Sequence, residues 1–464
     1  MKNLKTKFVH HLVWIVILAI AVEMNASGKI DTDGSLGMLP GLRGDLRLFT
    51  NTDSSSGDLP EVKVIDTVAD LSSAPEEVIL LNKTKDANEI SEAVSYIDGN
   101  KVENLAGTNR LNTLTGRIPG LLVMQADGQP GWENATISIR GRNTFGVLRE
   151  DPTILVDGHT ADIDMIDPYD IESITVLKDA ASTAMYGLRS GNGIILINTR
   201  RGHEGAFRVS INSQTSVTQP GGFPDLLDAA TYAELFNEAL INDGVVPRYS
   251  SADIEAYRQG TDPIGHPDND YMQDYLAESF LQTRNNLNIS GGGQNINYYL
   301  SMGYLYNNGL LNTVEKENTY NTNTDLNVIN IHGNINVQVT DNLSATMDIK
   351  AKKDKRVFPG VYNSEGISDF ISQMMGTPPN AYPIFLSPDT LGGTIDFRNN
   401  FYGQFNRAGY SFWERYYLSG FVDIKYDLGF LKGMSVIGSF GYNTFGDNII
   451  NRSKTFAVYE LIDG

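Results

Sequence analysis

The chain has 464 residues, of which 41% are hydrophobic and 20% charged, and this composition excludes both a disordered chain and a bundle of transmembrane helices. Its formal net charge of −20 argues against a nucleic-acid-binding protein, which needs a basic face. The absence of cysteine excludes a disulfide framework, a thiolate nucleophile and Cys-ligated zinc.

Residues 1–26 have the pattern of a secretory signal peptide. Three lysines, Lys2, Lys5 and Lys7, precede an apolar run that extends from residue 12 to residue 22. Small residues follow, and we expect cleavage after Ala26. The alternative is a transmembrane anchor, but an anchor needs about 20 apolar residues and this run is shorter.

Residues 27–90 read as a linker, and residues 91–203 as a small mixed α/β domain. Residues 27–60 are rich in Gly, Ser, Asp and Thr, and "EVKVIDTV" at residues 61–68 is a short β-prone run in this polar context. In the following domain, brief apolar strands alternate with turn signals and one or two short helices. "LVDGH" within it predicts a strand followed by a turn at Asp157–Gly158.

The segment "ESITVLKDAASTAMYGLRSGNGIILINTRRG" at residues 172–202 superficially suggests a phosphate-binding loop. Such a loop runs from strand to glycines to helix, so that the helix N-terminus meets the anion. Here the helix-forming "KDAASTAMYG" comes first, the glycines follow, and a strand comes last. We therefore predict a helix stop at Gly187 and a tight turn into a strand, with Asp179 capping or pairing locally, rather than a nucleotide site.

Residues 204–464 repeatedly show the alternation of polar and apolar residues that predicts two-faced strands. About seven such strands of roughly ten residues are expected. Short turns join them at residues 291–295, 340–342 and 429–433, and long segments join the other ends. A soluble β-sandwich also alternates, but short turns on one side and long loops on the other favour an outer-membrane β-barrel. Seven strands cannot close around a separate domain, so we expect the barrel to be incomplete at residue 464.

Several spaced motifs of residues 91–348 resemble the TonB-dependent outer-membrane receptors, and most closely their SusC/RagA branch. The motifs are "GRIPGLLVMQADGQPG" (116–131), "ISIRGRNTF" (137–145), "PTILVDGH" (152–159), the segment at 166–202, and "NDYMQDYLAESFLQTRNNLNISGGGQNINYYLSMGYLYNNGLL" (269–311). The resemblance implies a transmembrane β-barrel of about 22 antiparallel strands when complete, with a small mixed α/β plug domain in the lumen.

The resemblance also implies a function and partners. A family member imports a bulky nutrient, here a glycan or oligosaccharide or alternatively a peptide, across the outer membrane. It is energised by TonB and works with a SusD-like surface lipoprotein, and neither an enzyme activity nor a cofactor is expected. A receptor that binds its ligand for signalling or adhesion without import is the alternative function.

Candidate functional residues follow from this scheme. The candidate TonB box comprises Glu61, Val62, Lys63, Val64, Ile65 and Asp66, because TonB is engaged by strand addition and this run is β-prone. It departs from the family's usual valine-rich box, and residues 27–60 are too short for the β-domain that many relatives carry there.

Two further groups of residues are candidates for contacts. Arg140 and Arg142 could pair with acidic groups on the inner barrel wall, such as Asp348 or Asp423, or lie at a solvated strand end. The aromatic residues of the third long loop could stack on a ligand or pack the loop down. The ligand-loop candidates are Tyr402, Phe405 and Trp413.

Metal chemistry has little support in the sequence. The six histidines have no metal-ligand spacing, and His332 reads as a residue of the lumen wall. The acidic run "DIDMIDPYD" at residues 162–170 could offer oxygens to Ca²⁺, but it lacks the glycine and the terminal glutamate of a calcium loop.

Overall fold

The computed structural model describes residues 46–50, 77–80, 83–86, 92–103, 111–125, 128–129, 131, 135–141, 151–314, 320–360, 367–431 and 433–462. The predicted signal peptide, the candidate TonB box at residues 61–66 and Arg142 lie outside these ranges. Within them, no helix combines the length and the hydropathy that crossing a membrane requires.

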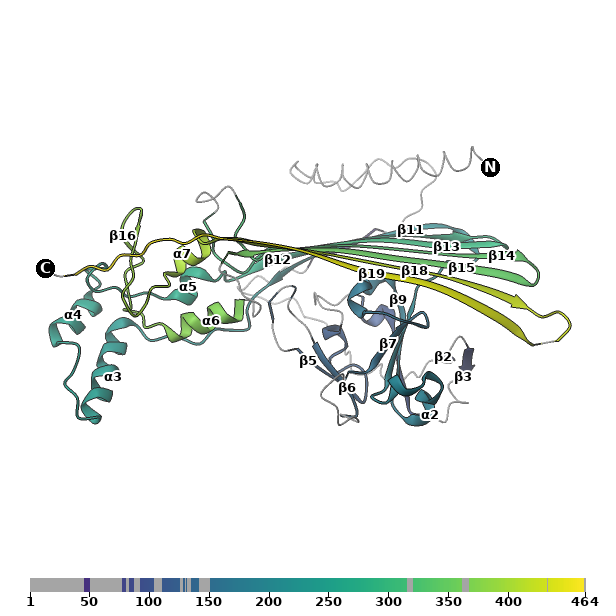
Figure 1. Ribbon diagram of the computed structural model, residues 1–464, viewed down its shortest axis with the longest axis horizontal. Coiled ribbons are helices and arrows are strands. Elements are labelled where there is room, and N and C mark those ends of the chain that lie inside the picture. The colour runs from purple at the N-terminus through teal and green to yellow at the C-terminus, as the bar shows by residue number, and fades with distance from the viewer. Residues whose placement is uncertain are drawn as a thin grey trace, which may run out of the picture. The chain divides into compact units, whose positions relative to one another are not determined.

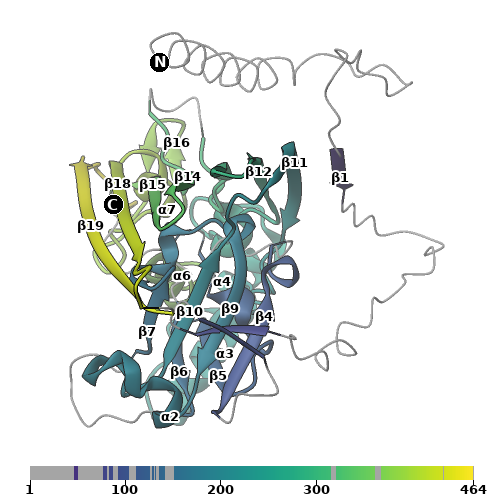
Figure 2. The ribbon, with the colours of Figure 1, turned by 90° about the vertical axis from the view of Figure 1, so that its right-hand side faces the viewer.

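A five-stranded sheet organises residues 94–199. In spatial order its strands are β4 (Val94–Asp98), β9 (Ile171–Leu177), β10 (Ile194–Thr199), β7 (Thr153–Val156) and β8 (His159–Thr160). β10 pairs antiparallel with β9 and parallel with β7 (Figure 2). The central strands are almost continuously apolar because both of their faces are covered.

The connection from β9 to β10 confirms the predicted order of helix, glycines and strand. It holds α2 (Ala180–Thr183) and the 3₁₀ turns η6 (Ala184–Tyr186) and η7 (Leu188–Ser190). Asp179 caps α2, and its Oδ1 accepts a hydrogen bond from the Ser182 amide at 2.9 Å. Gly187 ends the helical segment with a φ of 77°, a value that glycine adopts without strain. The glycines are turns, and the geometry is wrong for a phosphate loop.

Shorter elements complete this α/β unit. They are η2 (Gly99–Lys101), η3 (Asn112–Leu114), β5 (Leu121–Gln125), β6 (Ala135–Ile139), η4 (Ile163–Met165) and η5 (Pro168–Asp170). β5 and β6 form a separate two-stranded ladder, as do β2 (Glu77–Leu80) and β3 (Lys83–Asp86). The core of the unit is aliphatic, and it includes Leu114, Ile139, Ile174, Val176 and Ile195.

The second sheet has eight strands, in the order β1-β11-β12-β13-β14-β15-β18-β19. Its antiparallel strands, which lie side by side in Figure 1, are β11 (Gly205–Thr218), β12 (Phe280–Gly292), β13 (Ile296–Asn307), β14 (Leu326–Thr340), β15 (Leu343–Pro359), β18 (Gly409–Asp427) and β19 (Ser435–Ser453). β1 (Leu46–Thr50) pairs in parallel with β11. The seven alternating strands and all three short turns are therefore confirmed.

The two faces of the large sheet have opposite chemistry. On the inner face of β14 and β15, the polar side chains are buried: Asn330, His332, Asn334, Asp348, Lys350, Lys352 and Asp354. On the outer face, large apolar side chains are exposed, among them Ile329, Ile331, Ile335, Met347, Ile349 and Leu418. A soluble sheet buries its apolar face, whereas a membrane barrel shows this reverse arrangement.

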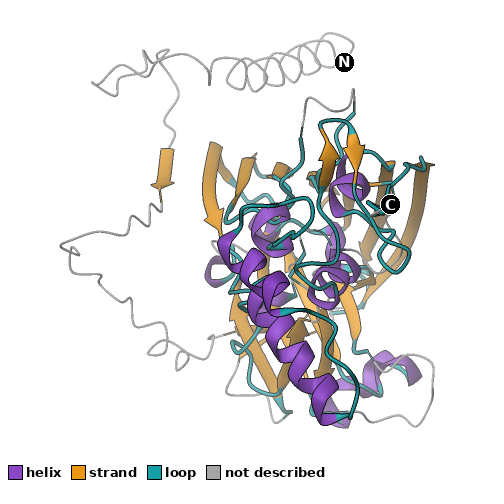
Figure 3. Cartoon of the chain, turned by 90° about the vertical axis from the view of Figure 1, so that its left-hand side faces the viewer, coloured by secondary structure: helices purple, strands orange, loops and turns teal. Residues whose placement is uncertain are grey.

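The long connections carry the remaining helices, which are purple in Figure 3. These are α3 (Ala229–Asn242) and α4 (Ser251–Gln259), α5 (Tyr271–Tyr275), α6 (Ile367–Gly376) and α7 (Phe401–Asn406), with the hairpin of β16 (Phe385–Ser387) and β17 (Thr390–Leu391). α5, α6 and α7 share an aromatic core, which we call the loop cluster. It contains Tyr271, Tyr275, Phe370, Met374, Tyr382, Phe401 and Phe405.

Candidate functional site

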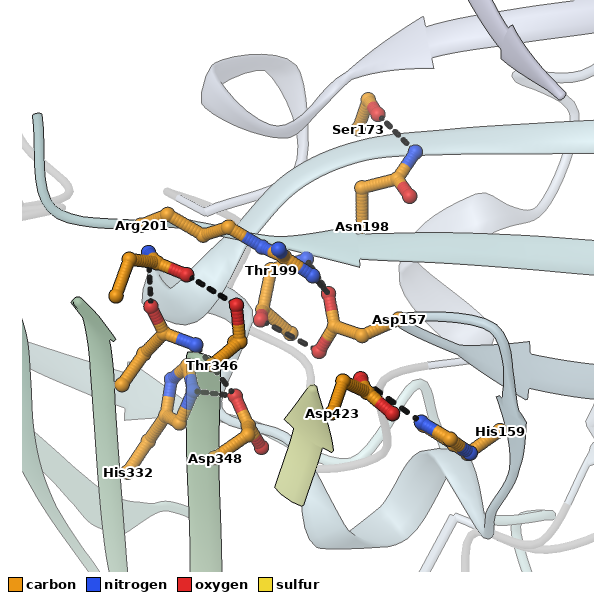
Figure 4. A network of polar contacts seen from close by, with 12 residues as sticks. Asp157, His159, Ser173, Asn198, Thr199, Arg201, His332, Thr346, Asp348 and Asp423 are labelled. Atoms are coloured by element: carbon orange, nitrogen blue, oxygen red, sulfur yellow. Dashed lines mark hydrogen bonds and ion pairs between the residues drawn. The ribbon is translucent and has the colours of Figure 1, made fainter. Parts of the chain in front are cut away.

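Buried polar side chains join the small α/β unit to the inner face of the large sheet. The α/β unit contributes the β7–β8 hairpin, the η5 turn and the residues after β10, and the large sheet contributes β13, β14, β15 and β18. We call this region the plug–wall interface. Figure 4 shows part of its network.

The β7–β8 hairpin presents Asp157 to the wall. Asp157 and Gly158 both have positive φ, 52° and 87°, as a two-residue hairpin turn of type I′ requires, and Val156 pairs with His159 across it. The carboxylate accepts hydrogen bonds from the amide and hydroxyl of Thr199, at 2.9 and 2.7 Å. The predicted turn at Asp157–Gly158 is confirmed, and it aims a buried charge at the large sheet.

Lys350 on β15 meets that charge. Its Nζ lies 2.8 Å from Asp157 Oδ2, and it also donates to Asp348 on its own strand. The side chains of Lys350 and Asp157 are each 6% exposed. Arg201 approaches the other oxygen of Asp157 at 3.6 Å. A buried ammonium therefore joins a carboxylate of the α/β unit to a carboxylate of the wall.

His332 on β14 extends the chain of charges. Its Nε2 lies 3.1 Å from Asp348 Oδ2, and its Nδ1 lies 3.8 Å from Asp170 Oδ2 in the η5 turn. The hydroxyl of Tyr299 on β13 donates to Asp170 Oδ1 at 3.0 Å. The contacts thus run from Asp157 on the β7–β8 hairpin, through the wall, and back to Asp170 in the η5 turn of the same unit.

Close backbone packing accompanies the charges at Gly303 on β13. The Asp167 carboxylate caps η5 by accepting from the Tyr169 amide at 3.0 Å, and it accepts from Asn330 Nδ2 at 3.2 Å. A Cβ atom at position 303 would lie 2.4 Å from Asp167 Oδ2. Glycine at this position therefore gives the Asp167 carboxylate the space that it occupies against β13.

A third contact lies on β18. The ring of His159 stacks on Phe421, with ring centroids 3.9 Å apart. His159 Nε2 lies 3.6 Å from Asp423 Oδ2, and Figure 4 shows this ion pair. His159 follows the Asp157–Gly158 turn directly, so one tight hairpin places two side chains on two neighbouring wall strands.

Two carboxyl groups of the α/β unit, those of Asp157 and Asp170, have pKa values shifted in opposite directions. Burial alone would raise the pKa of Asp157, but the cations of Lys350 and Arg201 outweigh it and hold that pKa below its ordinary value. Burial raises the pKa of Asp170 to about 6, since the neighbouring His332 offsets only part of the loss of solvation. Of these two groups, Asp157 is therefore held ionised, whereas Asp170 titrates at about pH 6.

The two acidic residues that we expected to pair with Arg140 or Arg142, Asp348 and Asp423, lie in this interface but have other partners. Asp348 and Asp423 both lie on the inner face, but their partners are His332, Lys350 and His159. Arg140 is exposed at the end of β6, near Lys178 and Asp179. No ion pair joins it to Asp348 or Asp423 among the residues that the structure describes.

The three aromatic ligand-loop candidates occupy different environments. Phe405 is fully buried in the loop cluster, so its ring packs the loop and offers no face to a ligand. Tyr402 packs at the edge of the cluster, edge-on to Phe385 at 4.6 Å. Trp413 lies on β18, edge-on to Phe358 at 5.9 Å, and donates from Nε1 to Ser411.

A further contact connects the α/β unit to the loop cluster. Gln129, in the "DGQPG" stretch, accepts at Oε1 a hydrogen bond of 2.7 Å from the backbone amide of Ile367, the first residue of α6. Gln129 is 2% exposed. The amide belongs to the helix's first turn, which has no partner within the helix, so a side chain of the α/β unit caps a helix of the loops.

Sequence reasoning missed the connected set of Lys350, His332 and Asp170, and it also missed the separate contact of Gln129. Alternation places Lys350 and His332 on the polar face, but it does not say what faces them. The partner of Lys350 is 193 residues away, and a single sequence carries no signal for that pairing. The one indication of the pairing is that Lys350 lies on the polar face of its strand and Asp157 lies at a predicted turn, where its side chain can reach another element.

Comparison with known proteins agrees with this architecture. Residues 86–194 match the family model described as TonB-dependent Receptor Plug Domain. The "TonB-dependent receptor SusC" of Bacteroides thetaiotaomicron is 30% identical over 308 residues, which are 63% of this chain and 29% of that protein. A TonB-dependent receptor of Formosa agariphila is 26% identical over 355 residues, covering 74% of this chain and 34% of the relative.

Solved structures share the fold. A solved structure of the RagAB peptide transporter superposes with a TM-score of 0.63 at 18% identity, over 77% of this chain and 41% of that one. The chain thus spans about three tenths of the length of SusC and two fifths of the solved transporter chain. The α/β unit is the plug domain, and the large sheet corresponds to barrel wall. The chain belongs to the TonB-dependent receptors of the SusC/RagA type, which are plugged β-barrel proteins of the outer membrane.

Proposed function

We propose that the protein is a TonB-dependent importer of a bulky nutrient, in which the plug domain closes a barrel of about 22 strands until ligand and TonB act together. The plug–wall interface is the observation that supports a gate. Its contacts are hydrogen bonds and ion pairs, for which water can substitute when the partners separate. An apolar interface would lack this property.

The proposed partners follow from the family. TonB would engage the segment of Glu61, Val62, Lys63, Val64, Ile65 and Asp66 by strand addition on the periplasmic side. A SusD-like surface lipoprotein would cover the ligand from outside. Trp413 and Tyr402 remain candidates for the ligand-facing side of the loops, because their rings are not fully buried.

A glycan or oligosaccharide is the substrate that we propose, and a peptide is the second class. The structurally similar RagAB complex is a peptide transporter, which supports the second class. Growth of a deletion strain on single glycans and on defined peptides separates the two classes.

An engineered disulfide between plug and wall tests the gate. A Cβ at position 303 would lie 3.1 Å from Asp167 Cγ, which is close to the distance of about 3 Å from Cβ to the far sulfur in a disulfide. The pair Asp167→Cys and Gly303→Cys should therefore cross-link, and residues 1–464 contain no cysteine that would compete. We expect the oxidised full-length receptor to stop import and the reduced one to recover it.

The matched control cross-links two wall strands only. Ser344 on β15 and Lys425 on β18 are register partners, so Ser344→Cys with Lys425→Cys should leave import unchanged in both redox states. Import that continues through the oxidised plug–wall pair would reject the gate. A receptor without import, the alternative function, predicts surface binding of the ligand with no uptake in any variant.

A further inference from the structure

On the outer face of the large sheet, a band of uncharged residues gives way to charged residues toward the strand ends that carry the long loops. On β18, the outer-face residues from Tyr426 to Leu418 are uncharged, as are their register partners on β14, β15 and β19. Tyr426 and Tyr416 are ten residues apart. With strands tilted by about 40°, ten residues rise about 25 Å, which matches the height of the apolar band of a membrane barrel.

Charge appears on this face just beyond that band. Four charged residues lie on the outer face by register, all toward the strand ends that carry the long loops. They are Lys353 and Lys355 on β15, Glu414 on β18 and Arg452 on β19. Lys353 Nζ lies 2.6 Å from Glu414 Oε1, and its side chain is 45% exposed. At this level, the two lysines and one carboxylate leave a net positive charge, and Arg452 adds a cation on the same face nearer the long loops.

Lys355 is available to a further anion. Its ammonium lies 5.1 Å from the centroid of the Phe412 ring, and it makes no ion pair with any described residue. Phe412 and Tyr416 flank the lysines on the same face of β18. Aromatic and basic residues together are typical of the level at which lipid headgroups meet a membrane protein.

A hollow of about 400 Å³ lies directly below the lysines. Its lining includes Ile329, Ile331, Ala351, Leu418, Tyr416 and Lys353. These six are outer-face residues by register, and Lys352 and Tyr417 border the hollow from the inner-face positions between them. Ala351 and Gly446 also line it and fill little of its space. An apolar hollow that opens toward a cationic rim fits an acyl chain whose headgroup carries negative charge.

We propose that this surface is a binding site for a membrane lipid with a phosphate-bearing headgroup, with its acyl chain in the hollow and its phosphate on Lys355 and Lys353. The charge of the rim and its height at the edge of the apolar band select a lipid over a second copy of the chain. The inference requires the outer-membrane placement but not import, so either proposal can fail while the other stands.

Native mass spectrometry of the full-length receptor tests the site. The receptor is delipidated and offered phosphatidic acid or phosphatidylcholine with the same acyl chains. We expect preferential retention of phosphatidic acid, and a loss of that preference of about fivefold in Lys355→Gln, since one lysine near an anionic headgroup contributes about that factor. The matched control is Lys425→Gln, a lysine on the inner face at the other end of the wall, which should retain the preference.

A second pair of variants tests the hollow without changing charge. Ala351→Phe should fill it and lower retention of both lipids, whereas Ala345→Phe, on the same face of β15 outside the hollow, should not. Equal retention of the two lipids by the wild type would overturn the proposal, as would equal effects of Lys355→Gln and Lys425→Gln. Displacement of the lipid by inorganic phosphate alone would reject the acyl-chain contact, and a receptor dimer in place of bound lipid would assign the face to a second copy.

Discussion

The plug–wall interface and the loop cluster are both buried, but they are held together by different forces. Charged and amide side chains meet in the interface, whereas the loop cluster packs six aromatic rings around Met374. Apolar packing is lost outright when surfaces separate, while polar partners can exchange each other for water. If the interface is the proposed gate, this difference predicts that the interface opens while the loop cluster keeps its structure.

Removal of one buried aromatic ring from the loop cluster should have the largest effect on stability. Phe401 contacts Tyr271 and Tyr275 and is 1% exposed, so Phe401→Ala should destabilise the cluster by about 3–5 kcal/mol. Hydrogen exchange of α5 and α7 in the full-length receptor measures the loss. Tyr402→Ala, at the edge of the cluster, is the control and should cost much less.

Removal of the buried charge at Asp157 should have the next largest effect. Asp157→Asn keeps an acceptor for Thr199 but loses the ion pair with Lys350, and should weaken the plug–wall interface by about 1.5–3 kcal/mol. The fluorescence of a plug label during urea titration reports the separation. If the loop cluster loosened first in this variant, the two regions would not be independent.

The raised pKa of Asp170 predicts a dependence on pH. A carboxyl group whose folded-state pKa is about 6 binds its proton more tightly than in the unfolded chain, so its stabilising contribution is lost as pH rises through 6. Between pH 5 and 7, the loss should be about 1 kcal/mol. Asp170→Asn should remove this pH dependence, whereas Asp179→Asn, at the exposed cap of α2, should leave it in place.

Removal of the hydrogen bond between Gln129 of the α/β unit and α6 of the loop cluster should have the smallest effect. Gln129→Ala removes the acceptor for the Ile367 amide and should cost about 0.5–1.5 kcal/mol, confined to the first turn of α6. Amide exchange at residues 367–370 measures it, and Gln129→Glu should restore protection. An effect that spread through the whole loop cluster would show that the plug holds the loops more firmly than one hydrogen bond implies.

Local chemistry predicts much of the fold. Alternation determines the strands and the face of His332, and the Asp157–Gly158 dipeptide determines its turn, because both depend on neighbours within a few residues. The partners in the interface could not be predicted in this way. Lys350 and Asp157 meet only after two sheets have formed, and Asp170 acquires its pKa from burial that no local pattern encodes.

The loop aromatics show the same limit. From the sequence, these aromatic residues could either stack on a ligand or pack the loop. Phe405 is fully buried in the loop cluster, so it packs the loop. The charge of Arg140 complements that of Asp348, which makes the pair plausible from sequence. Lys350 and His332, on the wall itself, already contact the Asp348 carboxylate. Charge complementarity between Arg140 and Asp348 does not reveal that Asp348 has partners on its own sheet.

The connection between β10 and β11 limits how far the plug can travel. Only residues 200–204 separate the last plug strand from the first wall strand, a span of about 20 Å when fully extended. The connection is held at two points, because the Arg200 amide donates to the Asp170 carbonyl and Gly202, in its middle, lies against the backbone of Tyr298. This short connection ties the plug to the wall at one corner. Under the proposed import, we therefore expect the passage to form by rearrangement of the plug around this connection, and not by departure of the whole domain.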